Sequence, residues 1–132
     1  MNDEQSQTGV VMEQKVTLAN RTKAFALRII RLCGSLPRTL ESQVLGKQLF
    51  RSGTSVGAHV REARRSRSDA EMISKYEVAL QELDETLYWM ELLAESEFST
   101  NEDLPRLQKE ADELISILVA SVKTIKRKKQ RT

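Results

Sequence analysis

The chain is 132 residues long, enough for one domain with its own apolar core. Charged residues make up 30% of it and apolar residues 39%, with two prolines and five glycines, a composition that favours long amphipathic helices over a sandwich of short strands. The single cysteine excludes an internal disulfide, and the lack of a secretory pattern or of about 18 consecutive apolar residues predicts a cytoplasmic protein without a membrane partner.

The net charge of +2 conceals a strong separation of charge along the chain. Residues 38–67 carry a net charge of +5 and residues 68–104 a net charge of −10, whereas the last ten residues contain six basic residues and no acidic one. We therefore expect local fields, rather than the total charge, to govern the choice of partners.

The first fifteen residues are polar and without periodicity, which predicts a disordered N-terminal extension over residues 1–15. Pro37 opposes helical geometry in the residue before it, so the first helix should stop there, and a short loop should run to about Glu41. The apolar stripe that predicts this first helix has steps that are multiples of three, four or seven and consists of Leu18, Phe25, Ile29, Leu32 and Leu36.

Residues 42–66 are predicted to form a second helix with three different faces. At about 100° per residue, its core face collects Leu45, Leu49, Ser52, Val56, Val60 and Ala63. The far side carries basic and small polar residues: Lys47, Arg51, Thr54, Ala58, Arg61 and Arg65.

The third face of this helix is kept small by Gly46, Gly53 and Gly57, with Phe50 beside them. A glycine inside a helix costs roughly 1 kcal/mol relative to alanine, which a helix tolerates where another backbone must come close. We interpret the small face as a close-packing contact, with Gly53 and Gly57 as candidate interface residues. A kink or frayed end and a ligand-binding loop are the alternatives.

A third helix is predicted to begin at Ser68, because Ser68-Asp69-Ala70-Glu71 fits a capping box. Further apolar residues, among them Trp89 and Leu93, lie on another side of the helix and exceed what one intramolecular seam uses, so we predict an interface with a second copy there. The seam itself repeats at three and four: Ile73, Tyr76, Leu80, Leu83, Leu87, Met90 and Ala94.

A polar turn at residues 99–102 precedes the fourth predicted helix, where Pro105 suits the first turn. Together the helices predict an all-α fold, an antiparallel up-down four-helix bundle over residues 16–125 followed by a basic tail at residues 126–132. The apolar stripe of the fourth helix consists of Leu104, Leu107, Ala111, Leu114, Leu118, Val122 and Ile125.

No constellation typical of an enzyme is present. Gly46-Lys47 lacks the earlier glycine and the following Ser or Thr of a phosphate loop. His59, the only histidine, has Val56 where a di-iron bundle needs a glutamate, so we expect it to be partly buried or interfacial. Cys33 is expected to pack at an apolar stripe. We predict a non-enzymatic protein with no catalytic residue, metal site or cofactor.

Two basic clusters are the candidate binding residues. Clustered Lys and Arg gain from counterion release on phosphates whatever the base sequence, which predicts non-specific binding of RNA or DNA. The alternatives are a solvated surface, or ion pairs between the arginines and the acidic third helix, including that of neighbouring protomers in a protein-interaction scaffold. The clusters are Arg61, Arg64, Arg65 and Arg67 in the second helix, and Lys126, Arg127, Lys128 and Lys129 in the tail.

Five stretches in the middle of the chain carry a resemblance to a known family: SQVLGKQLFRSGTSVGA at 42–58, VREA at 60–63, RSDAE at 67–71, SKYE at 74–77 and ETLYW at 85–89. Over roughly Phe25 to Glu97 the chain resembles the bacterial four-helix-bundle proteins first noticed as reading frames inside intervening sequences of 23S ribosomal RNA genes. His59 stands where we expect asparagine in that family.

The resemblance implies a closed antiparallel bundle that assembles into a ring-like homopentamer without enzymatic activity. A related branch serves diversity-generating retroelements as a basic, ring-shaped accessory protein that binds a reverse transcriptase and nucleic acid. The partners implied are therefore the protein itself, nucleic acid and a reverse transcriptase.

Overall fold

The computed structural model of the chain describes residues 17–131, which form four α-helices and, within that range, no strand. The helices are α2 (Leu18–Gly34), α3 (Leu40–Arg64), α4 (Asp69–Glu95) and α5 (Asp103–Arg131). The all-α prediction is confirmed. The predicted disordered extension, residues 1–15, lies outside the described residues.

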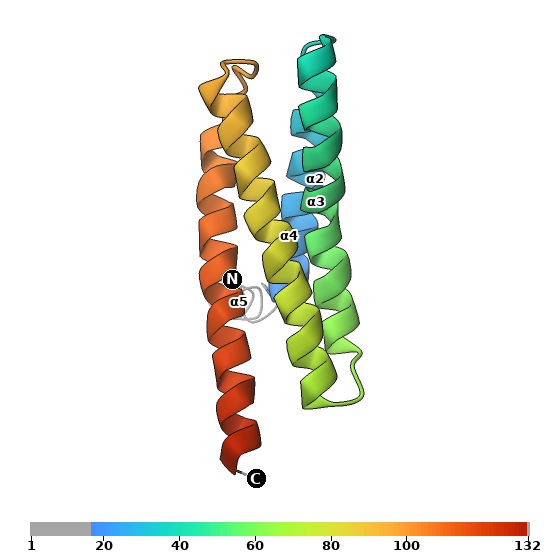
Figure 1. Cartoon of the computed structure of the whole chain (residues 1–132), viewed down its shortest axis with the longest axis vertical. Helices are drawn as coiled ribbons and strands as arrows, with labels where there is room; N and C mark the ends of the chain where they lie inside the picture. The colour runs from blue at the N-terminus through green and yellow to red at the C-terminus, as the bar shows by residue number, and fades with distance from the viewer. Residues whose placement is uncertain (1–16, 132) are drawn as a thin grey trace, which may run out of the picture.

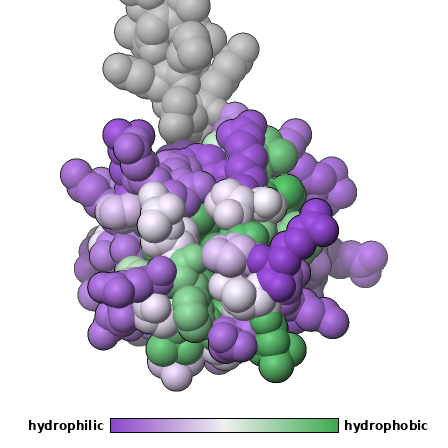
Figure 2. Space-filling view, turned by 90° about the horizontal axis from the view of Figure 1, so that it is seen from above, coloured by the Kyte–Doolittle hydropathy of each residue, from purple (hydrophilic) through white to green (hydrophobic). Residues whose placement is uncertain are grey.

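Each helix packs against the next one along the chain, and α5 also contacts α2, so the four helices enclose a common core. The α2–α3 and α4–α5 connections lie at one end of the molecule, and the α3–α4 connection and the end of α5 lie at the other (Figure 1). We call the first of these the loop end; seen from it, hydrophobic residues are interspersed among hydrophilic ones (Figure 2).

Three helices begin at a side-chain cap, which satisfies backbone N–H groups that have no partner inside the helix. Ser68 Oγ accepts from the backbone N–H of Glu71 at 3.1 Å, as the capping pattern predicts. Thr39 caps α3 in the same way, so this helix begins at Leu40, two residues before the predicted start. At the other end of α4, Glu97 adopts a left-handed φ of 62° and turns the chain toward α5.

The predicted stripes of the first, second and fourth helices form most of the core. Leu18, Leu45 and Ile125, at the ends of these stripes, are partly buried. Fully buried side chains include Phe25, Ile29 and Leu32 of α2, Leu49, Val56 and Val60 of α3, and Leu107, Leu114 and Leu118 of α5.

The buried stripe of α4 differs from the predicted one in every second position. Ala94, predicted to be buried, is exposed, and Leu80 and Leu87 are only partly buried. The reason is that α4 packs against both α3 and α5. Its buried face therefore includes small and polar residues, which a search for hydrophobic residues does not find. The hydroxyl of one of them, Thr86, is hydrogen-bonded to that of Ser52 in α3 at 2.9 Å. The stripe consists of Tyr76, Ala79, Leu83, Thr86, Met90 and Leu93.

Ion pairs join the helices along their outer edges. Arg28 of α2 donates two hydrogen bonds to the carboxylate of Asp103 in α5, and these bonds hold the pKa of Asp103 below its usual value. Arg21 pairs with α5 as well, through Glu110 and Glu113. The ion pairs therefore reinforce the contact between the first and the last described helix.

The glycine face of α3 packs against α2 of the same chain. A methyl group added at Gly53 would lie 2.9 Å from Cγ2 of Ile29, whereas one added at Gly57 would lie 3.4 Å from the carbonyl oxygen of Thr22. The first distance is an overlap and the second an ordinary contact. The predicted close-packing contact is thus present, and it is intramolecular at Gly53.

Alanine substitutions at these two glycines are predicted to change stability in opposite directions. Both remove a helix penalty of about 1 kcal/mol. Gly57→Ala should therefore raise the free energy of unfolding. Gly53→Ala should lower it, because overpacking against the stiff, β-branched Ile29 costs about 1–3 kcal/mol. Urea denaturation followed by circular dichroism at one protein concentration measures both. Equal stabilisation by the two variants would contradict the close approach at Gly53.

Candidate nucleic-acid interface

The two predicted basic clusters lie at the same end of the molecule, opposite the loop end; we call it the basic end. Arg61 and Arg64 belong to the last turn of α3, and Arg65 and Arg67 belong to the α3–α4 connection. The second cluster, residues 126–129, occupies the end of α5 near the C label in Figure 1. The predicted basic tail is therefore a continuation of α5 as far as Arg131.

The four arginines of the first cluster are exposed, and their side chains have no ion pair or hydrogen bond with any other residue in the described part of the chain. Arg51 behaves differently, since it pairs with Glu82 and Glu85 of α4. The predicted ion pairs between the second and third helices therefore form within the chain at Arg51, but not at the arginine cluster.

The basic residues of α5 are partly paired. Lys126 Nζ lies 3.3 Å from a carboxylate oxygen of Glu77 in α4. Arg127 and Lys128 are exposed and have no acidic partner among residues 17–131. The side chain of Lys126 is still 54% exposed in this ion pair. This end of α5 thus retains cationic groups that face solvent.

Lys23 of α2 also lies beside the arginines, although no sequence pattern groups it with them. It lines a depression of about 420 Å³ between α2 and α3 together with Arg61 and Arg65. An adjoining depression of about 320 Å³ is lined by Lys23, Arg61, Arg64 and Arg65, together with Ala19 and Asn20. The contribution of Lys23 depends on the packing of α2 on α3, which no local sequence pattern encodes.

The structure places the four predicted interface residues in different surroundings. Leu93 is completely buried in the core of its own chain, and Gly53 is covered by Ile29, so we correct the prediction for these two residues. Gly57 is partly exposed in the α2–α3 depression. Trp89 is partly buried and donates from Nε1 to Glu85 at 3.4 Å. An intermolecular role for Gly57 and Trp89 stays a prediction.

Apolar surface is nevertheless exposed, mainly on helices other than the predicted one. Leu40 is 75% exposed and Val44 53%, both near the loop end in α3. Tyr88 is the large exposed residue of α4, at 53%. The other large exposed apolar side chains in the described chain are Leu27, Ile30, Phe50 and Val119.

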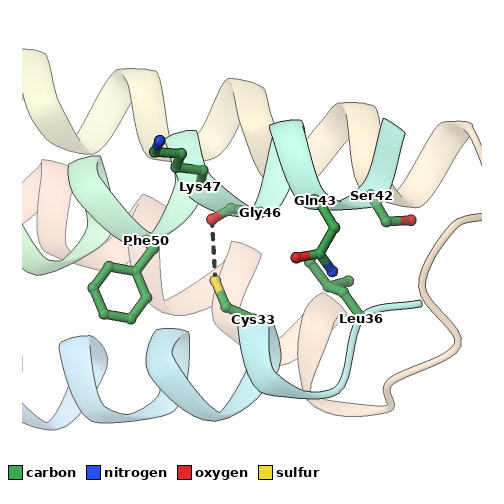
Figure 3. A pocket seen from close by; sticks show the side chains of 7 residues that line it. All are labelled: Cys33, Leu36, Ser42, Gln43, Gly46, Lys47 and Phe50. Atoms are coloured by element: carbon green, nitrogen blue, oxygen red, sulfur yellow. Dashed lines mark hydrogen bonds between the residues drawn. The ribbon is translucent and has the colours of Figure 1, made fainter. Parts of the chain in front are cut away.

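A third depression, of about 400 Å³, lies between the end of α2 and the start of α3 (Figure 3). Its wall includes Cys33, whose thiol donates a hydrogen bond to the carbonyl oxygen of Gly46 at 3.4 Å. Burial raises the pKa of Cys33 to about 11, so the thiol is protonated at neutral pH and is a poor nucleophile. The expectation that Cys33 packs at the edge of an apolar stripe is confirmed.

His59 and the possible metal ligands are the other groups considered in the sequence. His59 is 25% exposed, and its Nδ1 lies 3.8 Å from the carboxylate of Glu62 on the next turn of α3. Among residues 17–131, His, Cys, Asp and Glu side chains do not gather in groups of three or more that could hold a metal ion. None of the four helices is long and apolar enough to span a membrane.

Comparison with known proteins identifies a family and a solved structure that resemble this chain. Residues 14–120 match the family described as 23S rRNA-intervening sequence protein. The chain is also similar to the crystal structure of a protein of unknown function from the S23 ribosomal protein family of Bacteroides thetaiotaomicron. The TM-score is 0.75 and the identity 36%, with 81% of this chain and 99% of that chain covered. Among curated proteins none matches the chain.

The raised pKa of Cys33 predicts slow alkylation of the native thiol. At pH 8, iodoacetamide should modify Cys33 roughly a hundredfold more slowly than in the urea-unfolded chain, because the thiolate fraction falls tenfold for each unit of pKa. The native rate should rise as the pH approaches 11. Mass spectrometry of quenched samples measures both rates. Equal rates in the folded and unfolded chains would contradict the burial of this thiol.

Proposed function

The chain belongs to the 23S rRNA-intervening sequence protein family, and from this premise we propose that it is a non-enzymatic, cytoplasmic helical-bundle protein that binds RNA or DNA largely non-specifically through its basic end. One observation supports this proposal above the others. Basic residues from α3 and α5, far apart in sequence, lie at one end of the fold, and the four arginines there have no acidic partner within residues 17–131.

Phosphate groups are the part of a nucleic acid that this surface suits. Exposed Lys and Arg side chains release the counterions condensed on a phosphate backbone, which gives affinity without sequence preference. The exposed aromatic residues of the described chain, Phe50 and Tyr88, lie in the middle turns of α3 and in the loop-end half of α4. Both residues lie outside the basic end, so the contacts proposed there are with phosphates and not with bases. The proposed binding is therefore electrostatic.

Fluorescence anisotropy of a labelled ribosomal-RNA fragment over a salt series tests this function. We expect log Kd to rise linearly with log salt concentration. The double variant Arg67→Gln/Lys128→Gln should reduce the slope by about 1.4, or about 0.7 for each lost contact with a single strand. The matched control is Arg38→Gln/Lys47→Gln, which removes the same charges from exposed positions outside the basic end. Absence of binding even at low salt, or an equal effect of the control, would reject the proposal.

The second candidate function is a protein-interaction scaffold, or an accessory subunit such as that of a reverse transcriptase. The up-down bundle would then assemble into the ring-like homopentamer that the family resemblance implies. Two observations favour self-association: the large exposed apolar side chains of α2 and α3, and exposed acidic residues of α4, Asp84 and Glu91, that have no ion pair in the described chain. Arginines of one copy would pair with these carboxylates of the next.

A charge reversal separates this candidate from the first. Arg65→Glu should reduce the assembly to smaller species, because an inter-subunit ion pair becomes a repulsion. Light scattering coupled to size-exclusion chromatography measures the mass, with Arg38→Glu at the loop end as control. If Arg65→Glu has the same mass as the unmodified protein, Arg65 does not take part in assembly.

A further inference from the structure

The depressions between α2 and α3 at the basic end combine three properties that an exposed charged surface lacks. They are concave, their cations come from two helices, and part of their floor is made of small side chains. Together we call them the α2–α3 pocket. Lys23 enters from α2, Arg61 from α3, and Arg65 from the residue that follows α3; these three residues line one depression and recur in the adjoining one.

The cations of this pocket have no acidic partner in the part of the chain that the structure describes. Lys23, Arg61, Arg64 and Arg65 have no ion pair with any of residues 17–131. The acidic residue of the lining, Glu62, is already engaged, since its carboxylate lies 2.8 Å from Nζ of Lys75 in α4. The four like charges therefore face one hollow, and their mutual repulsion is relieved when an anion enters it.

The floor of the pocket allows such an anion to approach closely. Ala19 and Ala26 of α2 and Gly57 and Ala58 of α3 line the same depression, so much of its lining between the cations consists of small residues. A hollow of about 420 Å³ is ample for a group of phosphate size with its first waters. The first turn of α2, which supplies Ala19 and Asn20, adds the favourable end of a helix dipole for negative charge.

We propose that the α2–α3 pocket is a discrete phosphate-binding site in which Lys23 completes a clamp with Arg61, Arg64 and Arg65. This inference rests on the proposed nucleic-acid binding and makes it more specific: one phosphate of the backbone sits in the pocket, while the remaining basic residues act as diffuse charge. The same chemistry also suits the phosphates of a free nucleotide, and the experiment separates the two sources.

The test uses two changes that act on the pocket in different ways. Lys23→Gln removes one cation, and its control Lys47→Gln removes a lysine that is exposed on α3 outside the pocket. Ala58→Leu keeps every charge but fills the hollow. Because Ala58 is exposed, this variant should fold, which circular dichroism verifies. If binding is only diffuse electrostatic attraction, Ala58→Leu should leave the affinity unchanged. If the pocket is a binding site, Ala58→Leu should lower the affinity.

Binding of inorganic pyrophosphate is measured by isothermal titration calorimetry at constant ionic strength, and binding of labelled RNA by anisotropy. We expect the full chain to bind pyrophosphate, and Lys23→Gln to weaken this binding about tenfold, as expected for the loss of a hydrogen bond to a charged group. Ala58→Leu should also weaken it, because the larger side chain occupies the space of the anion. Lys47→Gln should leave it unchanged. RNA affinity should fall in the same two variants.

The outcomes distinguish the site from the function on which it rests. If the pocket variants lose pyrophosphate binding but keep RNA affinity, the pocket takes free phosphate compounds instead of the backbone. If RNA binds and neither pocket variant affects RNA or pyrophosphate binding, the pocket is not a site, although the proposed function stands. If the unmodified chain binds pyrophosphate but no RNA at low salt, the proposed function fails while the phosphate site remains.

Discussion

The close approach of α2 and α3 is the contact on which the rest of the molecule depends. It exists because Gly53 has no side chain where Ile29 lies, whereas at Gly57 a methyl group would only contact the backbone of Thr22. Two helices brought together in this way bury Phe25, Ile29 and Val56 in one core. The same approach carries Lys23 to the side of Arg61 and Arg65, so the packing of the glycines also builds the basic pocket.

The sequence specifies three of the four helices well, because their apolar stripes are long and almost free of polar residues. The buried face of α4 differs from the predicted seam for a physical reason. Its buried face contains Ala79 and Thr86, and the polarity of Thr86 is hidden by its hydrogen bond to Ser52 of another helix. A pattern of hydrophobicity cannot register a polar residue whose partner lies elsewhere in the chain. For this reason the hydrophobic pattern predicts Leu93 at an interface, whereas the structure buries it in the core.

Only part of the candidate site can be predicted from the sequence. Clusters of arginine and lysine are visible in the sequence, and charge alone made them candidates. Their meeting at one end of the fold depends on the alternation of helix directions and on the length of α5, and the inclusion of Lys23 depends on the contact between α2 and α3. The pairing of Arg51 with α4, in contrast to the unpaired arginine cluster, is likewise decided by which side chains face each other across helices.

The helical continuation of α5 to Arg131 imposes a geometric condition on whatever binds there. Successive residues of an α-helix project about 100° apart, so residues 126–129 point around almost the entire circumference of the rod. A straight, stiff polyanion touches only one side of such a rod and leaves the other cations unused. Lys126 lies toward α4, where it is paired with Glu77, so a ligand would have to be flexible enough to curve around the remaining side of the helix to reach more of these cations. Under the proposed function, the helical form of residues 126–129 would therefore favour a flexible ligand over a stiff one, whereas a disordered tail of the same composition would not.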